Sequence, residues 1–132
     1  DMAAFIFTKA ILEGKEMPVF NQGRMRRNFT HIDDIVSGVI ACLYQTLDNQ
    51  PPHKVYNIGN NKSESLMDFI HILEKHIGKR ALIRFEPLQQ GDVVETIADI
   101  EASTQDFGFT PRTNIDEGLK EFIDWYRHYY DI

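Results

Sequence analysis

The stretch THIDDIVSGVIACLYQTL, residues 30–47, indicates most clearly how this chain folds. Its apolar residues recur three and four positions apart, the spacing that places side chains on one face of an α-helix. That face consists of Ile32, Ile35, Val36, Val39, Ile40, Leu43 and Leu47. Thr30 precedes it and Asp33 follows three residues later, which is the spacing of a capping box. The pattern predicts one amphipathic helix, capped by Thr30.

Similar periodicity predicts helices on both sides of this one. They cover residues 2–13, 65–77 and 115–130, with a shorter helix over 101–107. Gly78 follows the helix at 65–77, where a left-handed residue commonly ends a helix. Short apolar runs between Pro, Gly or Asn residues predict strands at 17–20, 54–58, 82–86 and 94–98. Helices and strands alternate, so we expect one mixed α/β domain over residues 1–132, with too few strands for a doubly wound sheet.

The composition narrows the function classes. With 14 Lys and Arg against 20 Asp and Glu, the net charge is −6, which argues against binding to nucleic acid or to a membrane surface. A single cysteine, Cys42, allows no internal disulfide, so we expect a cytoplasmic protein. The five histidines show no metal-ligand spacing. No run approaches the roughly 18 apolar residues of a membrane span.

Three arginines form the one concentrated group of positive charge. Arg24, Arg26 and Arg27 follow an Asn-Gln-Gly turn and stand just before the central helix. Because guanidinium groups donate in a planar fork that matches phosphate oxygens, this group is a candidate pyrophosphate site. Charge clusters are also common on solvated turns, and the residues alone leave both readings open.

A second polar group, Gln89-Gln90-Gly91-Asp92, lies between two predicted strands. Asp92 has the chemistry to accept from a ribose hydroxyl, and Gln89 to donate to a phosphate or a sugar. The same four residues also form a good tight turn with no ligand role. The sequence contains neither GxSxG nor a phosphate-cradling GxGxxG or GxxxxGK, so it predicts no catalytic machinery within this chain.

Six blocks in this order resemble one family. They are DMA at 1–3, RNFTHIDDIV at 27–36, VYNIGN at 55–60, QQGDV at 89–93, TIAD at 96–99, and GFTP at 108–111 together with WY at 125–126. Together they resemble UDP-sugar epimerases of the extended short-chain dehydrogenase family, and among these most closely the UDP-glucuronate 4-epimerases. The resemblance covers essentially the whole chain.

The resemblance implies a small C-terminal substrate-binding domain, like that of UDP-galactose 4-epimerase, with the Rossmann half absent. In such enzymes the N-terminal half binds NAD and carries a Tyr-x-x-x-Lys pair, so we expect this chain alone to be inactive and to bind no NAD. Carried over by motif position, the substrate-binding residues are Val19, Phe20, Asn21, Arg27, Gln89 and Asp92. Val19, Phe20 and Asn21 would line the uracil and ribose. Arg27 would hold the diphosphate of a UDP-sugar, and Gln89 and Asp92 would reach phosphate or ribose.

Three departures from the family pattern leave the sugar open. Asn28 replaces an acid, His31 replaces a tyrosine, and Gln90 stands where proline is common. A nucleotide-sugar decarboxylase or dehydratase, or a stand-alone nucleotide-sugar-binding module, are the alternatives. The expected partners are the chain's own N-terminal Rossmann domain and further copies of itself. Helix 2–13 carries apolar residues on more than one side, which predicts self-association as a homo-oligomer.

Overall fold

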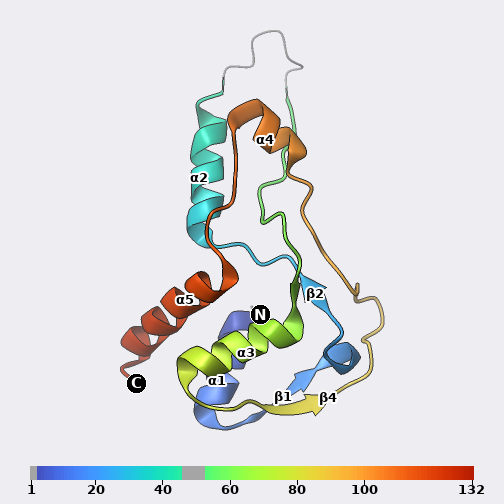
Figure 1. Cartoon of the computed structure of the whole chain (residues 1–132), viewed down its shortest axis with the longest axis vertical. Coiled ribbons are helices and arrows are strands. Elements are labelled where there is room, and N and C mark those ends of the chain that lie inside the picture. Colours follow the sequence, from blue (N-terminus) through green and yellow to red (C-terminus); the bar gives the residue numbers. More distant parts are fainter. Residues whose placement is uncertain (1–2, 46–52) are drawn as a thin grey trace.

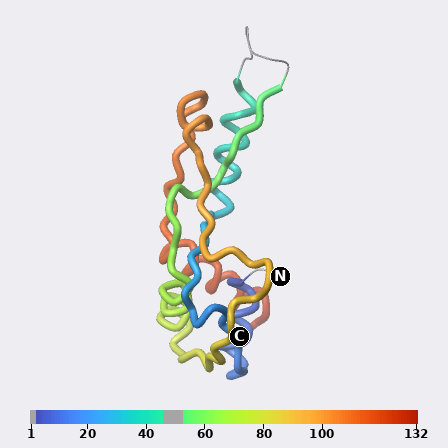
Figure 2. Tube along the Cα trace, turned by 90° about the vertical axis from the view of Figure 1, so that its right-hand side faces the viewer, coloured from blue at the N-terminus to red at the C-terminus, as the bar shows by residue number. Residues whose placement is uncertain are grey.

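The structure, a computed structural model, describes residues 3–45 and 53–132 and has a broad base that carries a long arm (Figure 1). The base comprises α1 (Ala3–Glu13), α3 (Leu66–Ile77), α5 (Ile115–Tyr130), β1 (Glu16–Val19) and β4 (Leu82–Phe85). The arm comprises α2 (Ile32–Leu43), α4 (Glu101–Phe107) and the extended residues 53–58. In Figure 2 these three segments run beside one another along the long axis.

The base is built around a two-stranded parallel sheet. β1 pairs with β4 in a register that runs from Glu16↔Leu82 to Val19↔Phe85. Along β1 the side chains alternate between exposed and buried, as a strand with one covered face requires. The core beneath it consists of Ile11, Met17, Val19, Met25, Leu66, Phe69, Ile70, Leu73, Ile77, Leu119 and Ile123. The predicted α/β class and the strands near 17–20 and 82–86 are confirmed.

The helices of the base begin and end where local chemistry placed them. Ser65 caps α3, with its hydroxyl accepting from the Asp68 amide at 3.4 Å. Gly78 ends α3 in the left-handed conformation at φ 77°. Asn114 caps α5 by accepting from the Glu117 amide at 2.9 Å. The predictions for 65–77 and 115–130 are therefore confirmed, and α4 in the arm confirms the helix at 101–107.

The prediction that Thr30 caps α2 is wrong. The capping side chain is His31, whose Nδ1 accepts from the Asp33 amide at 3.4 Å. Thr30 is engaged elsewhere, because its Oγ1 accepts from the Asn60 amide at 2.9 Å. The helix ends at Leu43. Leu47 and most of the loop that follows it lie outside the described residues.

Two predicted strands do not form. Residues 54–58 are extended but belong to no ladder within the described part of the chain. The stretch 94–98 contributes one isolated parallel bridge, between Glu95 and Arg26. The further ladder has only two residues on each side, β2 (Arg26–Arg27) against β3 (Glu64–Ser65). Strand propensity alone could not supply the missing partners.

Exposed apolar side chains gather on the arm. On α2 and its flank, Leu43 is 76% exposed and Tyr44 82%, and on the extended segment Val55 is 83% exposed. The expected apolar surplus of α1 is mostly packed, since the Phe5 ring lies 5.1 Å from that of Tyr126. The surface that predicts self-association is therefore on the arm instead of on α1. Among the described helices, none is long and apolar enough to cross a membrane.

Candidate functional site

The candidate site forms at the carboxyl ends of β1 and β4. The 3₁₀ turn η1 (Phe20–Gly23) follows β1 directly. Backbone bonds join it to the residue after β4: the Glu86 amide donates to Val19 O at 2.9 Å, and the Gln22 amide donates to Glu86 O at 3.2 Å. Parallel strands deliver the loops that follow them to one edge, which is where α/β proteins commonly bind ligands.

The turn η1 has an unusual backbone. Asn21 and Gln22 have φ values of 52° and 54°, in the left-handed region that L-residues seldom occupy. The next residue, Gly23, passes close under α3, where a Cβ atom would lie 2.6 Å from Met67 Sδ. The Asn21 side chain steadies the turn by donating to Arg24 O at 2.9 Å. Backbone strain of this kind clusters at ligand-binding sites, which supports a functional reading of η1.

Arg27 and Asp92 come together across 65 residues of sequence. Their contact depends on residues 94–96, which run beside β2: the Arg26 amide donates to Val94 O at 2.8 Å and the Thr96 amide to Arg26 O at 3.3 Å. Arg27 Nη2 then donates to Asp92 Oδ1 at 2.8 Å. Asp92 also closes the predicted turn, since its amide donates to Gln89 O at 3.1 Å.

The six predicted site residues differ in their burial and contacts. Val19 is fully buried in the core, and its carbonyl accepts from the Glu86 amide. Phe20 and Asn21 are half-buried on η1 and remain candidates. Gln89 is exposed in its turn. Arg27 and Asp92 are in direct contact, so the site as described is centred on this pair.

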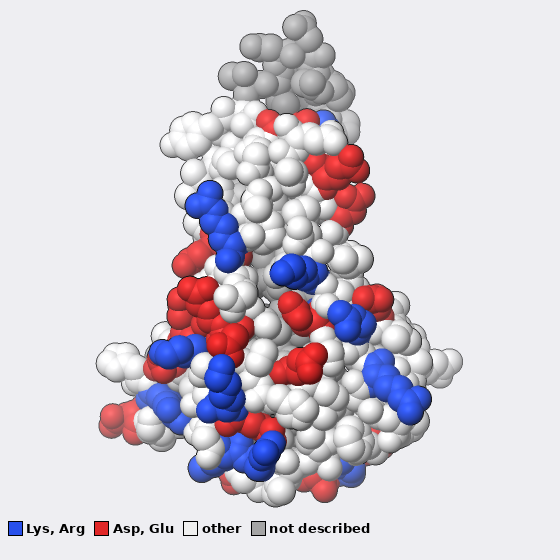
Figure 3. All heavy atoms as spheres, in the orientation of Figure 1, with Lys and Arg blue, Asp and Glu red and all other residues white. Residues whose placement is uncertain are grey.

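The other two arginines do not form a free positive patch. Arg26 donates from Nε to Glu95 at 3.1 Å and also bonds Ser63. Hydrogen bonds from Ser63 and then from Arg26 hold the pKa of Glu95 below its ordinary value. Arg24 is exposed. Figure 3 shows blue and red side chains mixed over the base, whereas the arm is largely uncharged on this face.

A polar network lies beside the site, and the sequence did not predict its contacts. The Asn28 side-chain amide donates to Asn60 O and, at 2.8 Å, to Lys62 O. Asn60 in turn bonds Thr30 and accepts from the Lys62 amide. An ionised carboxylate at position 28 has no hydrogen to donate to either carbonyl. The Asn28 departure therefore has a structural role, which was not evident because both partners lie more than thirty residues away.

A histidine with two carboxylates, His31, Asp33 and Glu121, is the group in the described residues whose spacing would suit a metal ion. His31 Nε2 lies 3.4 Å from Glu121 Oε2. However, His31 Nδ1 accepts the Asp33 amide, so in the neutral ring the proton sits on Nε2. Nε2, 3.4 Å from Glu121 Oε2, then carries the hydrogen and offers no lone pair to a metal. The group's evident role is to hold the start of α2 against α5.

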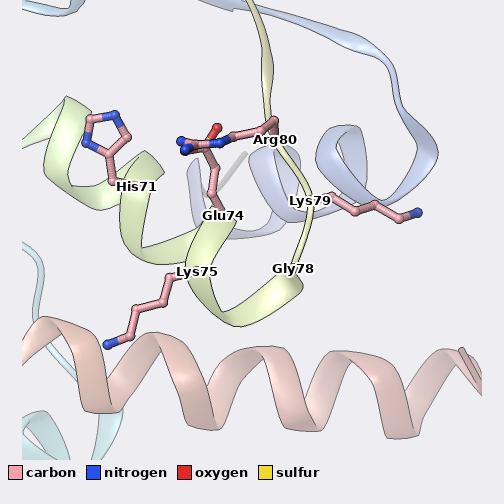
Figure 4. A pocket seen from close by; sticks show the side chains of 6 residues that line it. All are labelled: His71, Glu74, Lys75, Gly78, Lys79 and Arg80. Carbon is pink, nitrogen blue, oxygen red and sulfur yellow. The ribbon is translucent and has the colours of Figure 1, made fainter.

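Two hollows on the surface lie away from the Arg27–Asp92 pair. One, of about 400 Å³, is lined by His71, Glu74, Lys75, Gly78, Lys79 and Arg80 (Figure 4). There the Glu74 carboxylate accepts from Arg80 and from the Ala81 amide, so it fixes the turn after α3. Another, of about 560 Å³, lies between α1, α2 and α5 and includes His31 and Trp125. Neither hollow contains a predicted site residue.

Comparison with known proteins shows what the chain is similar to. The sequence profile of the NAD dependent epimerase/dehydratase family matches residues 2–59. An uncharacterized 37.6 kDa protein of Escherichia coli O111:H- is 44% identical over 100% of this chain and 44% of its own length. The probable UDP-glucuronate 4-epimerase of Rhizobium meliloti is 33% identical over 98% of this chain and 42% of its own.

A solved structure agrees with both relatives. It is the UDP-glucuronic acid 4-epimerase of Bacillus cereus in complex with UDP-glucuronic acid and NAD, 32% identical, with a TM-score of 0.88 over 98% of this chain and 41% of that one. Over residues 2–59 the chain matches the NAD dependent epimerase/dehydratase family, and over nearly all of its length it is similar to these relatives. It spans less than half the length of the curated relatives that it matches.

The NAD in the family name can be tested against the residues present. A dinucleotide site of the Rossmann kind needs a glycine-rich turn between a strand and a helix N-terminus. In this chain β1 leads into η1, and β4 leads into the loop that ends at Asp92. Neither turn carries the GxGxxG pattern. No chemical step is therefore assigned to the described residues.

Proposed function

We propose that this chain is the nucleotide-sugar-binding part of an NAD-dependent UDP-sugar 4-epimerase of the UDP-glucuronate and UDP-galacturonate class. The observation that carries the proposal is that η1 and the Gln89–Asp92 turn follow the carboxyl ends of β1 and β4, and that Arg27 donates to Asp92 of this turn. A guanidinium beside a strained turn and a polar loop is suited to a diphosphate and its nucleoside. The 4-epimerase named in the Bacillus cereus complex supports this ligand class.

In the proposed enzyme the chemistry belongs to the rest of the protein. NAD, when bound there, accepts and returns the hydride at the sugar. This chain anchors the UDP by charge-assisted bonds at Arg27, with Phe20 and Asn21 toward the nucleoside. Anchoring the nucleotide positions the sugar without gripping it, so the ring remains free to turn between the two hydride transfers.

The arm has a place in the same proposal. Its exposed apolar residues, such as Leu43 and Val55, are of the kind that a partner surface covers. Residues 54–58 are extended and pair with no strand in the described part of the chain. Asn57 O accepts from Ser103 Oγ at 2.8 Å, and the backbone groups beside it could join another sheet. We propose that the nucleotide-binding part of the longer protein supplies that cover.

Calorimetric titration with UDP tests the binding role. We expect saturable binding that Arg27→Ala weakens by about 10- to 150-fold, the worth of a hydrogen bond to a charged group. Arg24→Ala is the matched control, because it removes an exposed arginine three residues away and should leave the affinity unchanged. NAD should give no saturable heat. Unchanged UDP affinity in Arg27→Ala, or clear NAD binding, would contradict the proposal.

The chemistry itself separates epimerase from decarboxylase and dehydratase. In the full-length protein, UDP-glucuronate should yield UDP-galacturonate with no release of carbon dioxide or water. Release of carbon dioxide would assign a decarboxylase. A longer protein without a dinucleotide site would favour a binding module.

A further inference from the structure

Arg27 is held by the protein on one side only. A guanidinium has five N–H donors. Within the described residues, Arg27 Nη1 donates to its neighbour's carbonyl, Arg26 O, at 2.9 Å and to Val94 O at 3.2 Å. Nη2 donates once, to Asp92 Oδ1 at 2.8 Å. Three donors are occupied, and Nε–H and the second Nη2–H remain.

The two remaining donors form a useful pair. Val94 and Asp92 belong to one short segment, so their oxygens approach the edge that Nη1 and Nη2 share. The opposite edge then carries Nε–H and the other Nη2–H, which point in parallel. Two parallel N–H groups match two oxygens of a phosphate group, the geometry of a bidentate contact. With a side chain 25% exposed, Arg27 can still meet a ligand.

Asp92 is itself fixed through Oδ1, which gives it a role that does not depend on a ribose contact. Its Oδ1 accepts from Arg27 and, at 2.9 Å, from the Val93 amide. Its own amide closes the turn from Gln89. The carboxylate is therefore engaged with the arginine and its own loop before any ligand arrives.

We infer that Asp92 is a positioning residue that orients the free edge of Arg27 toward the diphosphate, an inference that rests on the proposed function. The alternative roles of Asp92 predict different changes in ligand affinity when its side chain is removed. As a mere neighbouring negative charge, Asp92 would repel the diphosphate, so its removal would strengthen binding. As a ribose contact, it would matter for UDP but not for a ligand that lacks ribose.

Titration with UDP and with inorganic pyrophosphate distinguishes these roles. Asp92→Ala should weaken both ligands by about 3- to 10-fold, the cost of immobilising one long side chain on binding. Asp92→Asn keeps an acceptor oxygen for Arg27 and removes the repelling charge, so it should bind both ligands as tightly as the wild type or more tightly. In the Arg27→Ala background, Asp92→Ala should have no further effect.

Several outcomes would overturn the inference. Asp92→Ala that weakens UDP alone would assign the ribose role, and Asp92→Ala that binds both ligands more tightly than the wild type would assign charge repulsion alone. In both cases a loss of UDP affinity in Arg27→Ala would leave the proposed function standing. If Arg27→Ala loses neither ligand, the proposed function itself fails. Far-ultraviolet circular dichroism confirms that each variant is folded.

Discussion

The base and the arm carry similar kinds of residues but complete their structures differently. In the base, α3 places Phe69, Ile70 and Leu73 at 1% exposure or less beneath the β1–β4 sheet. In the arm, α2 leaves Val36, Val39 and Ile40 between 46% and 48% exposed. The base thus covers the apolar face of α3 with its own elements, whereas the described part of the arm leaves that of α2 exposed. Amphipathic periodicity shows which face of a helix is apolar, but it does not show what covers that face.

The largest loss of unfolding free energy is expected from a substitution in the base. Phe69 is 1% exposed and stacks on Phe29 with ring centroids 4.3 Å apart. Phe69→Ala should lower the free energy of unfolding by about 3–5 kcal/mol, because it removes buried contacts and leaves a cavity. Leu43→Ala on the arm is the control and should change it by less than about 0.5 kcal/mol. Urea denaturation measures both, and equal losses would erase the distinction between base and arm.

A smaller loss of unfolding free energy is expected where the arm joins the base. The Asp34 carboxylate, 5% exposed, accepts from the amides of Arg112 and Thr113 at 2.9 and 3.0 Å. Asp34→Ala leaves these part-buried donors without their acceptor and should cost about 1–3 kcal/mol of unfolding free energy. The neighbouring Asp33→Ala removes a charge from the same helix turn at an exposed position. A loss as large in Asp33→Ala would assign the effect to helix electrostatics.

We expect the chain to self-associate through the surface of the arm. Ile40 on α2 and Ile6 on α1 are almost equally exposed, at 48% and 46%. If the arm forms the contact, Ile40→Ser should shift the chain toward the monomer, whereas Ile6→Ser should not. Light scattering after size exclusion measures the mass. The reverse result would return the contact to α1, and a wild-type monomer at high concentration would show that neither surface is adhesive.

The smallest effect is a pH dependence within the arm. Hydrogen bonds from Lys54 and then from Tyr56 hold the pKa of Asp106 below its ordinary 3.8. A carboxyl group whose pKa is lowered by folding stabilises the folded form above its ordinary pKa, and this contribution is lost as the pH falls through the lowered value. The Tyr56 ring signals should therefore shift below about pH 3.8, as the contact between residues 53–58 and α4 loosens. Asp106→Asn should abolish the shift, and its persistence there would assign the transition to another group.

The contrast between base and arm also explains what the sequence could predict. The helices were accessible because their signals are local: the apolar spacing of 65–77, the Ser65 cap and the Gly78 stop lie within a few residues of one another. The strand at 54–58 has the right composition, but a strand also needs a partner, and no described segment supplies one. Local signals predict helices better than they predict pairing.

The same limit applies to the candidate site. Arg27 and Asp92 were selected by their motif positions, yet nothing local shows that they meet. Their contact depends on the register of residues 94–96 beside β2. Val19 was also selected by its motif position, and nothing local showed that its side chain is buried in the core. His31 caps α2 in place of the predicted Thr30, because the Thr30 hydroxyl accepts from the Asn60 amide.

Residue-resolved hydrogen exchange on this chain tests most directly whether the base is self-sufficient and the arm is not. Amides in α3, which pack into the core of the base, should exchange only through global unfolding. Amides of residues 54–58, which have no ladder in the described structure, should exchange faster by several orders of magnitude, and those of α2 at intermediate rates. Protection at 54–58 equal to that of α3 would contradict the account, because the arm would then be as complete by itself as the base.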